Sequence, residues 1–208
     1  MSRQLSAQDT VETLVTCSFE TTDALVAIAR RHEAGCLQSK CASCCSEPLT
    51  VTAPEALYIA RYMKEHLTRE DFHELQAKVE ETCALINEKA WDDFEEAKVP
   101  CALYDEVEGC KIFDARPISC RSRGCLGKKP LARCVKEEEG NGAFAEAEQY
   151  GKEMVSKLKE TVKGQGLDGQ EYEFHSVVRR ALVTTQAELL WFKELNIFGN
   201  CRLPESDP

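Results

Sequence analysis

The segment Cys36-Leu-Gln-Ser-Lys-Cys41-Ala-Ser-Cys44-Cys45 places four cysteines within ten residues. Such spacing is typical of metal ligands, because a short turn lets the chain double back and bring several thiolates to one ion. The gaps of four and then two residues match the loop of plant-type 2Fe–2S proteins, which take their fourth cysteine from further along the chain. Here the fourth ligand could be Cys45 or a cysteine of a later segment. The spacing therefore predicts a metal centre and leaves the metal open.

A second group of cysteines follows in a segment rich in basic residues. Its members are Cys101, Cys110, Cys120, Cys125 and Cys134. From Lys111 to Lys136 the chain has eight basic residues and one acidic residue, so this stretch carries a formal charge of +7 and the remainder carries −17. Thiolate-ligated zinc and iron–sulfur centres are negatively charged, and nearby arginines can offset that charge, donate hydrogen bonds to sulfur and tune a redox potential. The bases could instead form a solvated face or an anion site.

The cysteine content also predicts a compartment and a kind of partner. The chain has 12 cysteines in 208 residues, and its first ten residues lack the apolar segment of a signal peptide. We therefore expect a cytoplasmic protein, in which thiols stay reduced and clustered cysteines bind metal more often than they form disulfides. There is no apolar run of about eighteen residues to span a membrane, and the net charge of −10 argues against general nucleic-acid binding. A metal ion is the expected partner, and a protein partner is left open.

Apolar residues at helical spacing predict a mainly α protein, a helical bundle with an irregular, cysteine-rich metal-binding loop region. A capping box at Thr52-Ala-Pro-Glu55 begins one helix, and Thr68-Arg-Glu-Asp71 begins the next, which keeps helical spacing until Pro100 ends it. Glycines and prolines interrupt residues 100–140, where we expect loops and one short hairpin. Further helices are expected over residues 8–34, from Asn141 to Gly164, and from about Gln170 to Leu195.

The whole chain, residues 1–208, is expected to form a single domain. Its cysteine-cluster core would span about residues 36–134 and its C-terminal helices about residues 141–196. The tail after Gly199 is expected to be loose.

The remaining cysteines and the histidines have simpler interpretations. Cys17 and Cys83 lie in helical segments, where we expect them to fill the core as buried thiols. Cys201 lies in the tail, where we expect an exposed thiol without a role. His32 precedes the first cluster by four residues, so it could be a ligand or could interact favourably with a helix C-terminus. The other histidines have no partner at ligand spacing: His66, His73 and His175.

Together the two clusters resemble a known family. The pattern is Cys-x2-Cys-Cys, then Cys-x2-Tyr, then Gly-Cys-x-Ile-Phe-x2-Arg-Pro-x2-Cys-Arg. The matching residues are Cys41, Cys44, Cys45, Cys101, Gly109, Cys110, Ile112, Phe113, Arg116, Pro117, Cys120 and Arg121. Cys36 and Cys125 stand at positions that are also commonly cysteine there. The pattern is similar to that of the YkgJ-type cysteine-cluster family of zinc- or iron-chelating domains and spans about residues 36–134. The resemblance implies metal chelation, since the family's biochemical activity is otherwise largely undefined.

The sequence therefore supports a metal-binding protein with cysteine ligands. The predicted ligands are Cys36, Cys41, Cys44, Cys45, Cys101, Cys110, Cys120 and Cys125, and Cys134 is left open. The favoured centre is an iron–sulfur cluster, with a role in electron transfer or metal handling. The alternatives are a zinc site that staples a helical protein-interaction module, and a metal-dependent enzyme of unknown reaction. For the enzyme, the sequence offers no converging acid–base residues, so no catalytic residue is named.

Overall fold

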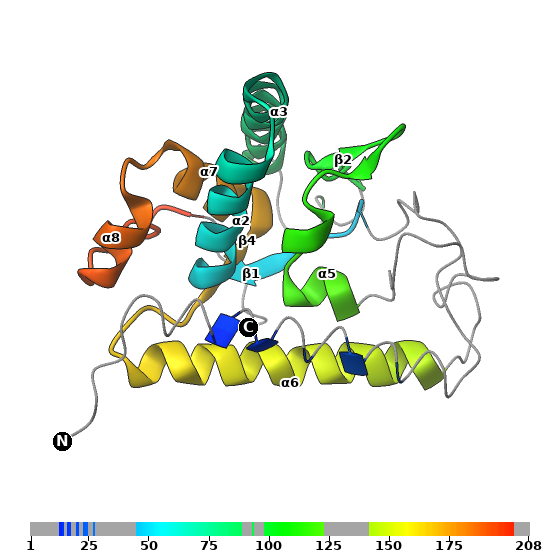
Figure 1. Cartoon of the computed structure of the whole chain (residues 1–208), viewed down its shortest axis with the longest axis vertical. Coiled ribbons are helices and arrows are strands. Elements are labelled where there is room, and N and C mark those ends of the chain that lie inside the picture. Colours follow the sequence, from blue (N-terminus) through cyan, green and yellow to red (C-terminus); the bar gives the residue numbers. More distant parts are fainter. Residues whose placement is uncertain are drawn as a thin grey trace.

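A computed structural model describes residues 45–88, 98–122 and 142–201, together with single positions between Thr13 and Ala27 and with Asp93. The predicted mainly α fold is confirmed, because long helices dominate these residues and the strands have only two or three residues each (Figure 1). In chain order the elements are β1 (Thr50–Thr52), α2 (Ala53–His66), α3 (Arg69–Asn87), β2 (Tyr104–Asp105), β3 (Gly109–Cys110), η1 (Phe113–Ala115), α5 (Ile118–Ser122), α6 (Gly142–Gly164), β4 (Glu171–Glu173), α7 (Phe174–Val183) and α8 (Ala187–Phe192).

Two helices begin where their capping signals predict. At the start of α2, the Thr52 backbone N–H and hydroxyl both donate to the Glu55 carboxylate at 2.8 Å, and Pro54 lies in the first turn. At the start of α3, the Thr68 hydroxyl oxygen accepts the Asp71 backbone N–H at 3.1 Å. These bonds are local in sequence, so the pattern alone was enough to place them.

The end of α3 was predicted wrongly. The helix ends at Asn87 rather than continuing toward Pro100. Ile86 is the last buried residue of the helix, and the residue after it, Asn87, is exposed. Asparagine is also a poor residue for a helix interior.

The expected C-terminal helix from Gln170 to Leu195 is also wrong, because the structure divides this stretch into β4, α7 and α8. Residues Glu171–Glu173 pair antiparallel with β1, Thr50 opposite Glu173. The apolar residues at helical spacing form a helix only from Phe174 onward. Gln186, with a left-handed φ of 55°, then separates α7 from α8. A strand partner about 120 positions away leaves no local signal.

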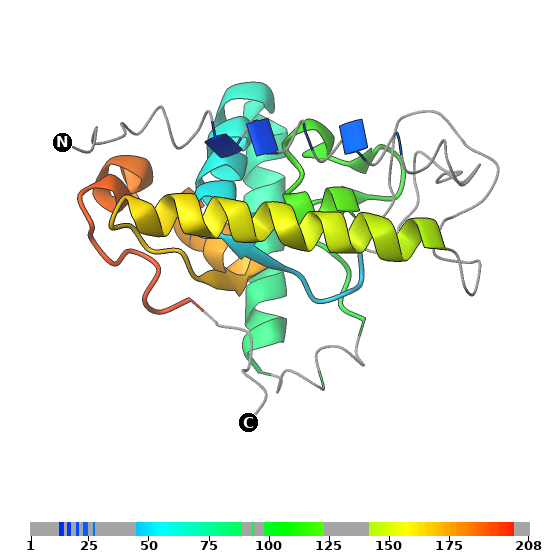
Figure 2. The ribbon, with the colours of Figure 1, turned by 90° about the horizontal axis from the view of Figure 1, so that it is seen from below.

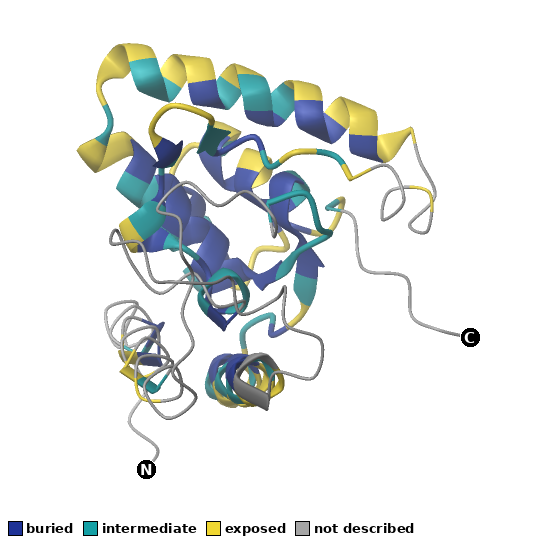
Figure 3. Ribbon diagram, turned by 90° about the vertical axis from the view of Figure 1, so that its right-hand side faces the viewer, coloured by how far each residue is buried: buried dark blue, intermediate teal, exposed yellow. Residues whose placement is uncertain are grey.

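The long helix α6 packs along one side of the molecule, across the other elements (Figures 1 and 2). It ends at Gly164 as predicted. Along the helix, buried residues alternate with exposed ones, as expected for a helix with one face against the core (Figure 3). The central helix α2 packs against α7, α7 also packs against α3, and α5 packs against α6. Among the described residues, no helix combines the length and hydropathy that crossing a bilayer requires.

The predicted hairpin in the cysteine-rich region is confirmed. Strands β2 and β3 pair antiparallel with Tyr104 opposite Cys110. Gly109 has a φ of 84°, a conformation that glycine adopts freely, and the Asp105 carboxylate accepts the Val107 and Glu108 backbone N–H groups at 2.7 and 2.8 Å. The short helices η1 and α5, which follow, were not predicted.

Candidate metal centre

Four of the eight predicted ligands lie in the described part of the chain: Cys45, Cys101, Cys110 and Cys120. The other four predicted ligands lie outside the described residues: Cys36, Cys41, Cys44 and Cys125. Cys134 and His32 also lie outside them. The described four share one property. Each is half-buried, so its sulfur is neither sealed in the core nor fully in solvent.

The last cysteine of the first cluster meets the first cysteine of the second cluster. The Cys101 backbone N–H donates to the Cys45 carbonyl oxygen at 2.6 Å, although the two residues are 56 positions apart. Further along, the Tyr104 N–H donates to the Cys101 carbonyl at 3.1 Å, which turns the chain into the hairpin. Cys45 and Cys101, one from each cluster, therefore adjoin in space, as a shared centre requires.

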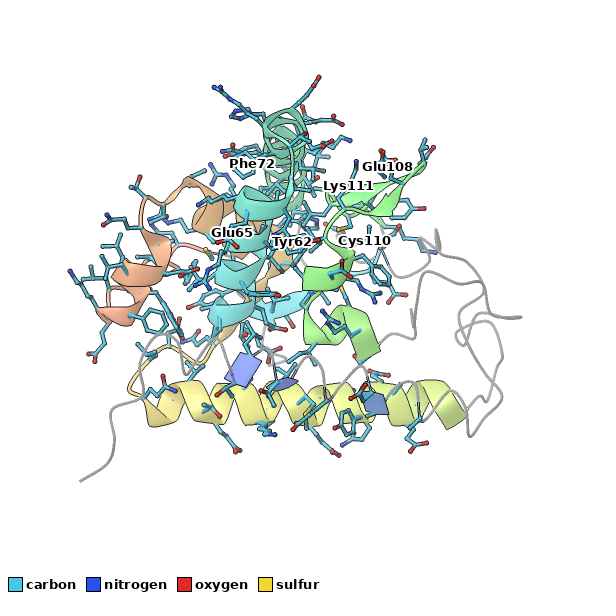
Figure 4. The ribbon with its side chains drawn as sticks, viewed as in Figure 1. Tyr62, Glu65, Phe72, Glu108, Cys110 and Lys111 are labelled. Carbon is cyan, nitrogen blue, oxygen red and sulfur yellow. The ribbon has the colours of Figure 1, made fainter. Side chains whose placement is uncertain are left out.

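Cys110 lies on β3, facing helix α2. Tyr62 of α2 lies beside it, with Glu65 one turn further along the helix (Figure 4). The next residue, Lys111, fastens the hairpin, because its ammonium group pairs with Glu108 and lies 3.6 Å from the Asp71 carboxylate of α3. The hairpin that carries Cys110 is thus held against both α2 and α3.

Cys120 lies on α5, and a buried carboxylate fixes the start of that helix. Glu55 is only 2% exposed, and its Oε1 accepts the Ile118 backbone N–H at 2.9 Å while its Oε2 accepts from Thr52. Burial raises the pKa of Glu55, and the N–H groups of Thr52 and Ile118 oppose that rise. One side chain therefore caps α2 and anchors the helix that carries Cys120.

Two arginines of the predicted charge-compensating set flank Cys120 in the sequence. Arg116 packs its guanidinium over the Phe113 ring at 3.9 Å and donates to the Phe113 carbonyl at 3.1 Å. Arg121 donates to the carbonyls of Arg116 at 2.8 Å and Asp114 at 2.6 Å. Burial and the neighbouring Arg116 lower the pKa of Arg121, yet an arginine stays charged at neutral pH. Both positive charges are thus fixed by the local backbone, and that of Arg121 interacts electrostatically with Cys120.

A histidine from α7 reaches the first cysteine of the second cluster. The Nε2 of His175 accepts the Ala102 backbone N–H at 3.3 Å, and the ring lies next to the Cys101 side chain. Its Nδ1 lies 2.9 Å from Oε1 of Glu173, which is fully buried. Burial lowers the pKa of His175, but its contacts with Cys101 and Glu173 outweigh burial and raise the pKa.

Sequence reasoning missed His175, Glu173 and the anchoring role of Glu55. His175 was set aside because it has no partner at ligand spacing, whereas its partner in the fold is Cys101, 74 positions earlier. The sequence shows only that Glu173 and His175 are two positions apart. An acidic residue followed closely by a histidine is common at helix starts and does not by itself indicate a site.

The cysteines outside the clusters behave in two ways. Cys17 and Cys83 are buried, at 0% and 4% exposure, which confirms their predicted role as core thiols. Burial raises the pKa of both, that of Cys83 to about 12. The prediction for Cys201 was wrong, because this thiol is half-buried and lies 3.7 Å from the Ser176 carbonyl. Cys201 packs against the hydrophobic core.

The donor chemistry of the cysteine segment fits a thiolate-bound metal. Among the described residues, no three His, Cys, Asp or Glu side chains converge into a group that could hold an ion. Half of the predicted cysteines lie outside those residues. Half-buried sulfur donors, with fixed arginines beside one of them, are the soft ligands that zinc and iron–sulfur clusters take.

Comparison with known proteins supports the same chemistry. The model of the CxxCxxCC family, described as "Putative zinc- or iron-chelating domain", matches residues 35–140, just over half of the 208 residues. No match was found among curated proteins or among solved structures. The matched segment contains both cysteine clusters and ends before α6.

Proposed function

The chain belongs to the CxxCxxCC family of zinc- or iron-chelating domains, and we propose that it holds an iron–sulfur cluster through its two cysteine clusters. The proposed ligands are drawn from Cys36, Cys41, Cys44, Cys45, Cys101, Cys110, Cys120 and Cys125. The observation that carries this proposal is the 2.6 Å hydrogen bond from the Cys101 N–H to the Cys45 carbonyl. It joins the two clusters at one point of the fold, so ligands from both can serve one centre.

Two features favour iron–sulfur over zinc. The gaps of four and two residues between Cys36, Cys41 and Cys44 match those of plant-type clusters. Arg116 and Arg121 are fixed by backbone carbonyls and flank Cys120 in the sequence, so their charges can offset the negative charge of a cluster and tune its potential. A cluster would supply one-electron exchange, so we propose electron transfer or metal handling as the role, in the reducing cytoplasm.

The protein's own residues would hold and orient the sulfurs. The Cys45 carbonyl fixes the backbone at Cys101, and Glu55 fixes the helix that carries Cys120. The hairpin β2–β3 places Cys110 against α2. These contacts do not depend on metal, so the described part of the site is organised before a metal arrives.

The test is anaerobic purification of the full chain, with metal analysis and an absorption spectrum. We expect a brown protein that contains iron and sulfide and absorbs near the 400 nm region typical of iron–sulfur clusters. A colourless protein with stoichiometric zinc would refute the cluster and leave chelation by the same cysteines. A metal-free protein that is fully folded would refute metal binding itself.

Two serine variants give a matched comparison. Cys120→Ser should lose metal, because it removes a proposed ligand next to the two arginines. Cys201→Ser is the control, since Cys201 is also half-buried but lies outside both clusters, and a serine hydroxyl can still donate to the Ser176 carbonyl. Equal metal content in the two variants would exclude Cys120 from the ligand set.

A further inference from the structure

The junction between β4 and α7 carries a buried Glu–His pair that lies outside the segment matched by the family model. Glu173 is fully buried and His175 is 5% exposed. The Glu173 carboxylate lies 2.9 Å from Nδ1 of the His175 ring. It also accepts the backbone N–H groups of His175 and Ser176, at 2.9 and 2.7 Å. Glu173 therefore caps α7 and fixes the orientation of the imidazole in the same contact.

With Nδ1 held by Glu173, the remaining ring nitrogen faces the cysteine segment. The Ala102 backbone N–H donates to Nε2 at 3.3 Å, and the ring lies next to the Cys101 side chain. Cys101 is the residue whose own N–H bonds to the Cys45 carbonyl. The ring thus meets the second cluster at the point where it adjoins the first.

We propose that His175 is a positioning residue of the metal centre, whose ring holds the backbone beside Cys101 in place while Glu173 holds the ring. This inference rests on the proposed function, because it takes Cys101 as a ligand. Groups that orient the ligands of a metal from outside are typical of protein metal sites, and loss of such a partner typically weakens metal binding by about 10- to 100-fold. Here the carboxylate and the imidazole come from the C-terminal half of the chain.

The same contact couples the metal centre to the C-terminal elements. Strand β4 pairs with β1, and α7 packs against both α2 and α3. Metal bound at Cys101 would therefore restrain the ring and the first turn of α7. Amide exchange near His175 should slow when metal is bound, whereas exchange in α8, which is joined to α2 through the Arg61–Glu188 ion pair, should change little.

Three substitutions at His175 separate the contact with Ala102 from the contact with Glu173. Glutamine places an amide near the position of Nε2, where its oxygen can accept the Ala102 N–H. Asparagine places one near Nδ1 but is too short to reach Ala102, and leucine keeps volume without polar atoms. His73→Gln is the control, because His73 is exposed on α3. Each full-length holoprotein, purified anaerobically, is titrated with a chelator, and the concentration that removes half of the metal is measured.

We expect that concentration to fall about 10- to 100-fold for His175→Asn and His175→Leu. His175→Gln should retain most of the wild-type affinity, and His73→Gln all of it. The thiolate-to-metal absorption band should shift in the asparagine variant. Unfolding of the metal-free proteins by urea shows how much of each effect is structural, and the comparison of Gln with Asn remains valid if the leucine variant fails to fold.

Several results would overturn the inference. Equal chelator resistance in wild type, Gln and Asn would mean that the ring does not act on the metal centre. A loss of affinity that only parallels lower stability of the metal-free protein would reduce His175 to a structural residue. A metal–nitrogen bond to His175 in X-ray absorption would make it a ligand instead. In all three cases the wild-type protein still binds metal, whereas a wild-type protein without metal would refute the proposed function.

Discussion

Gly151→Ala tests how α5, the helix that carries Cys120, is held against α6. A Cβ at Gly151 would overlap the Ser122 Cβ and lie 3.8 Å from the Ser122 Cα. Rotation of the serine side chain moves its hydroxyl but leaves its Cβ in place, so α5 or α6 must shift. Overpacking of this kind costs about 1–3 kcal/mol. Alanine gains up to about 1 kcal/mol over glycine within a helix, so we expect a net loss of about 1–2 kcal/mol.

The matched control is Gly164→Ala at the end of the same helix. A Cβ at Gly164 has no atom within 4 Å, so this variant gains helix propensity without a clash. We expect it to be neutral or stabilised by up to about 1 kcal/mol. Urea unfolding of the metal-free proteins measures both changes, and chelator titration of the holoproteins reports whether the shift of α5 weakens metal binding.

Ser122→Gly in the Gly151→Ala background removes the carbon that the new methyl group overlaps. Part of the lost stability should return, and a double-mutant cycle gives the interaction between the two sites. Equal stabilities for Gly151→Ala and Gly164→Ala would show that α5 does not approach α6 as closely as the structure has it. The account of how Cys120 is held would then fail.

Three further predictions concern other parts of the site. Glu55→Gln should lower stability by about 1–3 kcal/mol, because an amide group cannot accept from Ile118 and Thr52 on both sides; unchanged urea unfolding would contradict it. Gly109→Ala should cost about 1–2 kcal/mol in the same measurement, since φ is 84° there. At pH 8 the Cys83 thiol, with a pKa of about 12, should have about a thousandfold less thiolate than one with the ordinary value of 9.0. Mass spectrometry should find it unalkylated until urea is added.

The helix starts could be predicted because the atoms that determine them are neighbours in the chain. Thr52 and Glu55 are three residues apart, as are Thr68 and Asp71, and each pair makes the expected contact. The hairpin was predictable for a similar reason, because residues 100–140 contain the glycines that tight turns need. Local chemistry of this kind is present in any single sequence.

The C-terminal region shows where local chemistry stops being sufficient. Residues 171–173 read as part of a helix, yet they form a strand because Thr50–Thr52 offers them backbone partners about 120 positions away. The link between His175 and Cys101 depends on that same pairing, since β4 leads directly into α7. All eight candidate ligands were named from the sequence, whereas the residue that we propose to orient one of them could be found only from the fold.

Three backbone N–H groups tie the cysteine segment 98–122 to the rest of the chain. Cys101 donates to the Cys45 carbonyl, Ala102 donates to His175, and Ile118 donates to Glu55. Each donor is a cysteine or lies within two residues of one, so the anchors act on the backbone close to the sulfurs. None of the three involves a sulfur, so metal removal should leave them intact. Residues 98–122 should therefore keep slow amide exchange in the metal-free protein, unlike a zinc finger, in which metal binding and folding are one event.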